Sequence, residues 1–154
     1  MPQKKCQEVI KNSKKRDDES ENAYNMRIRQ EFLNILFGKK HFFKGQLVKF
    51  DKNKTPEGEV VCFWHITTDS SKDSGERKPD PKRYKKSTLV FLIIDHCDQI
   101  GCPSITAKPD EKFPDRISVY CADLKYAIIL KPKETHYDFV TAYPVSPGQE
   151  QYYL

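Results

Sequence analysis

The chain has 154 residues, of which 37% are hydrophobic and 32% are charged. This length fits one domain, and the apolar residues gather into segments dense enough for a modest core. The 27 lysines and arginines exceed the 22 acidic residues, and the net charge of +5 is compatible with a polyanionic partner without requiring one. No apolar run approaches the roughly 20 residues that a membrane-spanning helix needs.

The N-terminal 21 residues are polar and charge-dense, so we expect a flexible or loosely docked segment ahead of a single domain at residues 22–154. No apolar segment typical of a secretory signal follows the first basic residues. The five cysteines cannot all pair within one chain. We therefore expect a cytoplasmic protein with free thiols. The spacing of His96, Cys97 and Cys102 matches no usual metal-ligand motif, so no metal and no cofactor are expected.

The first helix is predicted at residues 22–37, where apolar side chains recur at helical spacing and Gly38 supplies a stop. His41 lies beside two phenylalanines and is expected to be structural. A short strand is predicted at residues 46–49. A turn is predicted at residues 53–58, which contain a proline and a glycine.

Residues 59–68 (EVVCFWHITT) are rich in β-branched and aromatic side chains, which favours a strand. Side chains alternate along a strand, so His65 and Thr67 would share one face and Trp64 would lie on the other. The polar stretch at residues 69–79 is expected to form a loop. Asp80 then resembles a helix N-cap with a proline in the first turn, and we expect that helix to end near residue 98.

The C-terminal third is predicted to be an antiparallel meander. Residues 101–114 contain three prolines and are expected to form a loop. Strand-like runs follow at residues 116–121, 126–130 and 139–145. Helices followed by consecutive strands indicate an α+β domain.

Several segments, taken in order, match the pattern of one known family. They are FWHITT at residues 63–68, RKPDPKR at 77–83, YAIIL at 126–130 and FVTAYP at 139–144. Together they resemble the metal-independent ribonuclease toxins of the Barnase–EndoU–ColicinE5/D–RelE group, especially its phage-associated branch. The resemblance spans residues 42–145. It implies an N-terminal helix, or helices, packed on a small antiparallel β-sheet.

RNA cleavage without a metal uses the ribose 2′-hydroxyl as an internal nucleophile. The site must remove its proton, hold the phosphate, neutralise the charge on its oxygens and protonate the leaving 5′ oxygen. Histidine titrates nearest neutral pH, arginine grips phosphate in a fork, and hydroxyl groups orient phosphate oxygens. The catalytic candidates are His65, Thr67, Arg77, Arg83, Thr141 and Tyr143, and the candidates for substrate binding are Lys82 and Lys85.

Thr141 and Tyr143 are two residues apart and would share one face of the last strand. The resemblance implies that this strand lies beside the predicted strand of His65, with the catalytic candidates around one phosphate. His65 and Tyr143 are both candidates for the general acid. The resemblance further implies an endoribonuclease of toxin or phage-defence type that leaves a 2′,3′-cyclic phosphate. Its partners would be an RNA substrate and an antitoxin or immunity protein, with no membrane.

Residue types alone leave other interpretations open. A histidine in a strand often has a structural role, and Thr141 and Tyr143 are good strand formers. Arg77, Lys82 and Arg83 are also compatible with an ordinary solvated charge run. The alternative functions are therefore a catalytically silent RNA- or protein-binding domain of the same fold from a mobile element, and a small domain without a nucleic-acid role.

Overall fold

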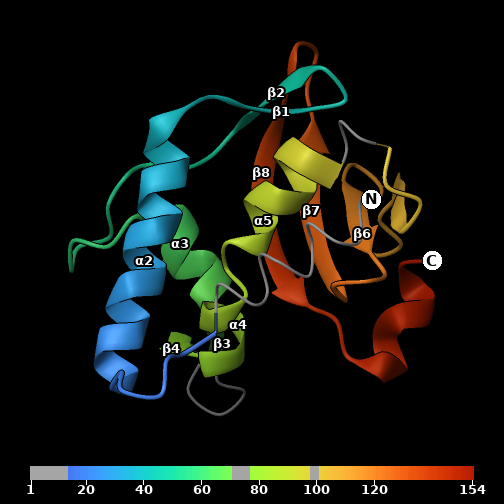
Figure 1. Ribbon diagram of the computed structural model, residues 1–154. Helices are drawn as coiled ribbons and strands as arrows, with labels where there is room; N and C mark the ends of the chain where they lie inside the picture. Colours follow the sequence, from blue (N-terminus) through green and yellow to red (C-terminus); the bar gives the residue numbers. More distant parts are fainter. Residues whose placement is uncertain (1–13, 71–76, 98–100) are drawn as a thin grey trace.

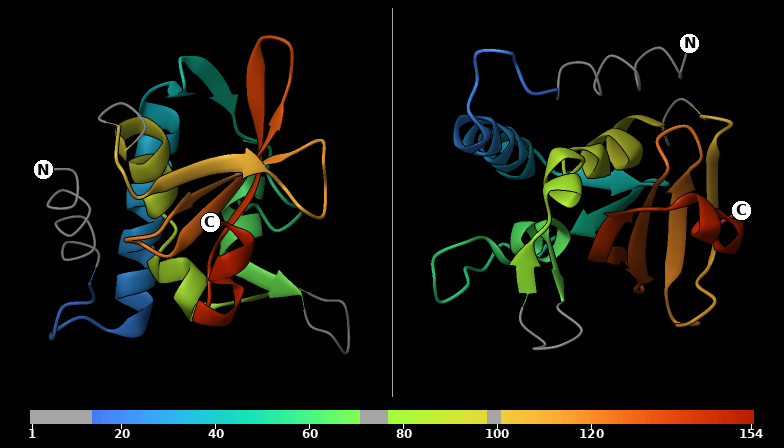
Figure 2. Two further views of the ribbon diagram at one scale, coloured as in Figure 1. Left: turned by 90° about the vertical axis from the view of Figure 1, so that its right-hand side faces the viewer. Right: turned by 90° about the horizontal axis from the view of Figure 1, so that it is seen from below.

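A computed structural model describes residues 14–70, 77–97 and 101–154 (Figure 1). Within these ranges, a six-stranded, mostly antiparallel sheet has the strand order β1-β2-β8-β7-β6-β5. The long N-terminal helix and the C-terminal 3₁₀ helix lie on opposite sides of this sheet (Figures 1 and 2). The architecture is α+β, as the sequence predicts.

The N-terminal helix, α2 (Glu21–Gly38), confirms the prediction at residues 22–37, with Gly38 as its last residue. The Ser20 hydroxyl caps it by accepting a 3.1 Å hydrogen bond from the Ala23 amide. One stripe of the helix is buried at helical spacing and comprises Tyr24, Ile28, Phe32 and Leu36. This stripe packs α2 onto the rest of the domain.

The charged segment before α2 is docked in its described part. Residues 1–13 lie outside the described residues, and residues 14–20 contain no helix or strand. Arg27 of α2 donates hydrogen bonds of 2.9 and 3.0 Å to the Glu19 carboxylate and one of 3.0 Å to the Lys14 carbonyl. The hydrogen bond from Arg27 lowers the pKa of Glu19 to about 2, so this pair stays charged at neutral pH.

The strand predicted at residues 59–68 is wrong, because most of this segment is helical. Helix α3 (Val61–Thr67) buries one side, comprising Cys62, Phe63, Ile66 and Thr67. The run VVCFW is apolar throughout, so its pattern cannot distinguish a strand from a short buried helix. Tertiary packing overrides the strand propensity of its β-branched and aromatic residues.

The predicted loop at residues 69–79 contains the two strands of a hairpin. Strand β3 (Thr68–Ser70) pairs antiparallel with β4 (Arg77–Pro79), while residues 71–76 lie outside the described residues. Asp80 then caps α4 (Pro81–Lys85) as predicted, since its carboxylate accepts a 2.9 Å hydrogen bond from the Lys82 amide.

The single helix expected from residue 81 to 98 is instead broken into pieces. After α4 come α5 (Leu89–Phe91) and the π-helix η1 (Leu92–Cys97). Ser87 and Thr88 separate α4 from α5, and the Ser87 hydroxyl donates to the Tyr84 carbonyl at 3.0 Å. Such side-chain bonds to the backbone compete with helix continuation, which explains the interruption.

The main sheet contains four of the predicted strands and two, β1 and β5, that the sequence did not predict. The strands are β1 (His41–Phe43), β2 (Gln46–Lys49), β5 (Ile105–Pro109), β6 (Ile117–Cys121), β7 (Tyr126–Pro132) and β8 (His136–Pro144). Strand β5 falls in the proline-rich segment that was predicted as a loop. Among the described strands, the only parallel pairing is between β2 and β8, and it ends at Asp138. Beyond that residue, β8 remains paired with β7, but its other edge pairs with no strand of the described chain. The strand also contacts α3 and α4.

The core lies between the helices and one face of the sheet. Phe32 of α2 packs against Phe63 and Phe91, with ring centroids 4.9 and 4.8 Å apart. His41 is buried beside this core, and its ring nitrogens lie 2.6 Å from an Asp95 carboxylate oxygen and 3.0 Å from the Ile35 carbonyl oxygen. These contacts give His41 the structural role that was expected. The opposite face of the sheet carries a smaller cluster under the C-terminal 3₁₀ helix, η2 (Pro147–Tyr152).

Three cysteines of the described chain, Cys62, Cys102 and Cys121, are free and buried. Burial raises the pKa of the Cys62 thiol to about 12, which makes it a poor nucleophile. Among the described residues, no group of three or more histidines, cysteines or acids is arranged to hold a metal. None of the described helices is long and apolar enough to cross a membrane.

Candidate functional site

His65 lies in the last turn of α3 with its side chain exposed. Thr67 follows two residues later, which in a helix turns it about 200° away from His65. Its side chain is buried, and its hydroxyl donates a 2.8 Å hydrogen bond to the Phe63 carbonyl. The expectation that His65 and Thr67 share one face is therefore wrong, and Thr67 is not presented to a substrate.

Arg77 of β4 binds the C-terminal end of α3. Its Nη2 donates to the carbonyl oxygens of His65 and Thr68 at 2.8 and 2.9 Å. Its Nε donates to the Thr68 hydroxyl at 2.8 Å. The last carbonyls of a helix lack partners within the helix, and a cation is favourable at that end. Arg77 thus joins the β3–β4 hairpin to the turn that carries His65.

Arg83 of α4 extends this positive surface toward β8. Its guanidinium carbon lies 5.9 Å from the ring centroid of Tyr143. Its polar contacts are long: 3.4 Å to the Thr68 carbonyl, 3.5 Å to Asp69 and 3.8 Å to Asp80. About a fifth of the Arg83 side chain is exposed, and ion pairs of this length contribute little stability, so an incoming anion can replace them.

The surroundings of His65 favour its neutral form. Partial desolvation and the nearby charges of Arg77 and Arg83 lower the pKa of the imidazole. Within the described ranges, no other side chain hydrogen-bonds to the imidazole. The ring is therefore an exposed, neutral base at neutral pH, next to two permanent cations.

Thr141 and Tyr143 lie on the face of β8 that is turned away from the main core. Both line a groove of about 540 Å³. The other lining residues are Asp110, Glu111, Lys112, Phe113, Arg116, Ile129, Gln149, Tyr152 and Tyr153. The Tyr143 hydroxyl lies 2.5 Å from that of Tyr153, and burial together with this hydrogen bond raises the pKa of Tyr143. Tyr143 therefore stays protonated at neutral pH.

Arg116 and Phe113 were not among the sequence candidates. The guanidinium carbon of Arg116 lies 4.3 Å from the ring centroid of Phe113, whose side chain is exposed. The Nε atom of Arg116 is buried without a hydrogen-bond partner, and its guanidinium pairs with no carboxylate of the described chain. In the sequence, Phe113 and Arg116 are marked only by their closeness to each other near a proline-rich segment. Such a pattern is too common to identify a binding site.

Lys82 and Lys85 do not join this cluster. Lys82 is exposed in the first turn of α4, and Lys85 lines a different pocket on the other side of that helix. The structure thus brings His65, Arg77, Arg83 and Tyr143 into one connected region, with Thr141 in the adjoining groove. Thr67, Lys82 and Lys85 lie outside it.

No protein-family model, curated protein or solved structure matches this chain.

Proposed function

We propose that this protein is a metal-independent endoribonuclease that cleaves RNA by attack of the ribose 2′-hydroxyl and leaves a 2′,3′-cyclic phosphate. The observation that carries the proposal is the His65 imidazole at the end of α3, whose pKa is lowered by partial desolvation and by the nearby guanidinium groups of Arg77 and Arg83. A neutral imidazole accepts the 2′-hydroxyl proton, and adjacent cations offset the charge that develops on the phosphate.

The two arginines have different roles in this proposal. Arg77 uses its guanidinium to bond the end of α3, so it is a positioning residue for His65. The polar contacts of Arg83 with the described residues are all long, and its guanidinium can turn toward a phosphate. Guanidinium groups bind phosphate oxygens through charge-assisted, often paired hydrogen bonds. Arg83 is therefore the proposed phosphate ligand.

The groove on the outer face of β8 supports binding of an RNA strand. Its volume of about 540 Å³ falls within the range of about 300–1,000 Å³ typical of ligand sites. Phe113 and Tyr152 offer exposed rings on which bases stack, and Arg116 supplies a charge for the backbone. Tyr143 remains protonated. When the Tyr153 hydroxyl donates the hydrogen bond that joins the two residues, the Tyr143 hydroxyl can donate its own proton in a hydrogen bond to the phosphate or the leaving oxygen.

One observation favours a second candidate, a catalytically silent RNA-binding domain. Asp69 lies 3.5 Å from Arg83, so a carboxylate already faces the cation that the phosphate would use. If the pair persisted in the presence of RNA, the phosphate would lack its main ligand. The Asp69 side chain is exposed, however, and its 3.5 Å contact with the less exposed Arg83 is long, so a phosphate can displace it.

Incubation of the purified protein with total RNA in EDTA tests the proposal. Enzymatic detection of the new ends is expected to reveal 2′,3′-cyclic phosphates and 5′-hydroxyl groups. A 2′-O-methylated oligonucleotide, in which the nucleophile is blocked, should remain intact. Cleavage that requires a divalent metal would contradict the mechanism, and RNA binding without any cleavage would favour the silent domain.

A further inference from the structure

A second basic surface lies on the other side of α4 from Arg83. It is a pocket of about 410 Å³ that draws its lining from three separate parts of the chain. The lining residues are Lys14, Lys15, Tyr24, Lys85, Lys86, Leu89, Asp123, Leu124 and Lys125. We call this set the lysine pocket. Five of the nine residues are lysines and one is acidic, so its charge is strongly positive.

The lysines of this pocket are held close together by structured backbone. The Lys14 carbonyl accepts a hydrogen bond from Arg27 of α2. Lys85 ends α4, and Lys86 caps it. Lys125 lies in the turn between β6 and β7, where its carbonyl accepts a 2.8 Å bond from the Val145 amide. The pocket is therefore built by tertiary contacts rather than by one run of lysines.

Most of this charge is not neutralised by the residues that the structure describes. Across the parts of the chain that the structure describes, Lys14, Lys15, Lys85 and Lys86 form no ion pair. Lys125 has only a 3.7 Å contact with Glu150, and about half of its side chain is exposed. Like charges held in one pocket repel each other, so an anion that bridges them relieves this repulsion.

The lysine pocket and the candidate site lie on two sides of α4. Arg83 and Lys85 are two residues apart, which turns their side chains about 200° apart on a helix about 10 Å across. Lys125 is also tied to the chain just beyond Tyr143 through its bond with Val145. A polyanion that leaves His65 along Arg83 therefore reaches the lysines by passing around one short helix, which Figure 1 shows below α3.

We propose that the lysine pocket binds the phosphodiester backbone of the RNA a few nucleotides away from the bond that is cut. The proposal rests on the proposed function and adds the substrate class: an RNA strand long enough to wrap α4. Several ammonium groups line this one pocket. Lysine acts as a point charge without a fixed hydrogen-bonding direction, so these groups can bind the phosphates of a flexible RNA strand in several orientations.

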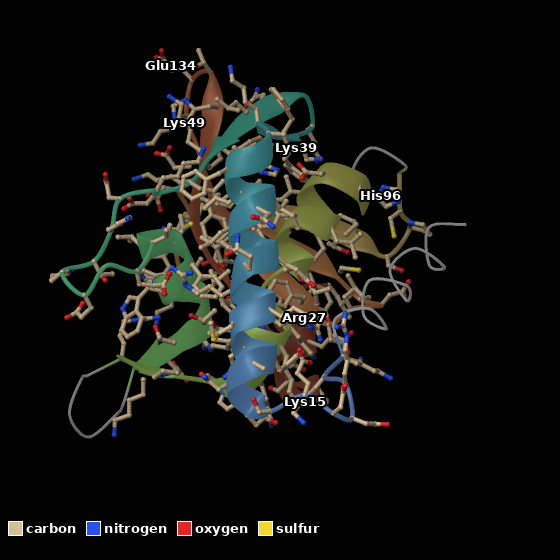
Figure 3. The ribbon with its side chains drawn as sticks, turned by 60° about the vertical axis from the view of Figure 1, so that its left-hand side comes forward. Lys15, Arg27, Lys39, Lys49, His96 and Glu134 are labelled. Atoms are coloured by element: carbon tan, nitrogen blue, oxygen red, sulfur yellow. The ribbon has the colours of Figure 1, made fainter. Side chains whose placement is uncertain are left out.

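A charge-matched pair of variants tests this proposal. Lys85→Glu combined with Lys86→Glu reverses charge in the pocket. Lys40→Glu combined with Lys49→Glu makes the same change in net charge at exposed lysines that form no ion pair with the described residues. Figure 3 shows Lys49 at the opposite end of α2 from Lys15, which belongs to the pocket. The control therefore separates local binding from general electrostatic attraction.

The probe is a 2′-O-methylated oligoribonucleotide of about 12 nucleotides, which binds without being cut. Fluorescence anisotropy over a salt series is expected to show at least about tenfold weaker binding by the pocket variant. The slope of log affinity against log salt should fall by about 2, because two phosphate contacts are lost. The control variant should stay within about twofold of the wild type. All substituted side chains are exposed, so the thermal unfolding midpoints should agree.

Equal weakening in both variants, or no weakening in the pocket variant, would overturn the proposal. This failure differs from failure of the proposed function, which would be seen as the absence of cyclic-phosphate ends with the wild-type protein. Because the probe cannot be cleaved, the binding result does not depend on catalysis.

Discussion

The guanidinium of Arg77 donates a 2.8 Å hydrogen bond to the backbone carbonyl of His65. The same guanidinium also bonds Thr68, so the β3–β4 hairpin holds the end of the helix on which His65 stands. One side chain thereby fixes the position of the imidazole and places a permanent charge beside it. Arg77 therefore affects both the position of the proposed base and its pKa.

Removing a neighbouring cation should raise the pKa of His65. Arg83→Gln deletes a charge that disfavours the imidazolium, whereas Arg83→Lys keeps it. NMR titration of the His65 ring protons should show a higher pKa in Arg83→Gln than in Arg83→Lys or the wild type. An identical pKa in all three proteins would contradict the electrostatic account.

The lowered pKa of His65 also determines how the cleavage rate should depend on pH. A base with a lowered pKa stays neutral to lower pH, so the rate should decline only below the ordinary histidine value of 6.5. In Arg83→Gln, this acidic decline should begin at a higher pH than in the wild type. A rate profile whose midpoint does not follow the measured pKa of His65 would assign the base to another group.

Replacing the proposed base should abolish most of the activity without unfolding the protein. We expect His65→Ala to slow RNA cleavage by about 10²- to 10⁴-fold, the usual contribution of a general base. Its side chain is exposed, so circular dichroism and the thermal midpoint should match the wild type. His136→Ala, at the start of β8, serves as the control and should cleave normally. Full activity of His65→Ala would remove His65 from the mechanism.

Thr67→Val tests whether Thr67 is a buried residue of helix α3, as the structure shows, or a substrate contact on a strand, as the sequence predicts. The substitution removes the hydrogen bond to the Phe63 carbonyl but keeps the shape of the buried side chain. We expect a loss of about 0.5–1.5 kcal/mol in the free energy of unfolding, measured by denaturant titration, and an unchanged cleavage rate. Strong loss of activity in a folded Thr67→Val protein would mean that this hydroxyl contacts the substrate.

Arg116→Ala should weaken RNA binding without changing the chemical step. Arg116 lines the groove beside Thr141 and Tyr143 and has no carboxylate partner in the described chain. Loss of one phosphate contact should lower the slope of log affinity against log salt by about 1. The control is Arg29→Ala, because Arg29 of α2 is already paired with Glu59. Identical salt slopes for both variants would exclude the groove as part of the RNA path.

Much of the fold could be predicted from local sequence patterns. Helix α2 has a clear apolar stripe, and the Asp80 cap acts within one turn of chain. The error at α3 arose because an entirely apolar run carries no period. Strand β5 was hidden by prolines at its flanks and by its dependence on β6, a partner that local patterns do not reveal.

The candidate site was less accessible to sequence reasoning. The proximity of Arg83 to Tyr143 depends on how α4 packs beside the last half of β8, where the pairing with β2 has ended. The contribution of Arg116 depends on the sheet that brings it to the same groove as Thr141. Both are long-range contacts, which residue types and spacing do not encode.

The most direct test of the central claim uses an oligoribonucleotide that carries a single 2′-deoxy residue at a mapped cleavage site. In EDTA, the wild-type protein should cut the all-ribose oligonucleotide at that site to a 2′,3′-cyclic phosphate and leave the 2′-deoxy bond intact, because the internal nucleophile is missing. Cleavage at the 2′-deoxy position, or cleavage of either substrate only after a divalent metal is added, would contradict the mechanism proposed for His65.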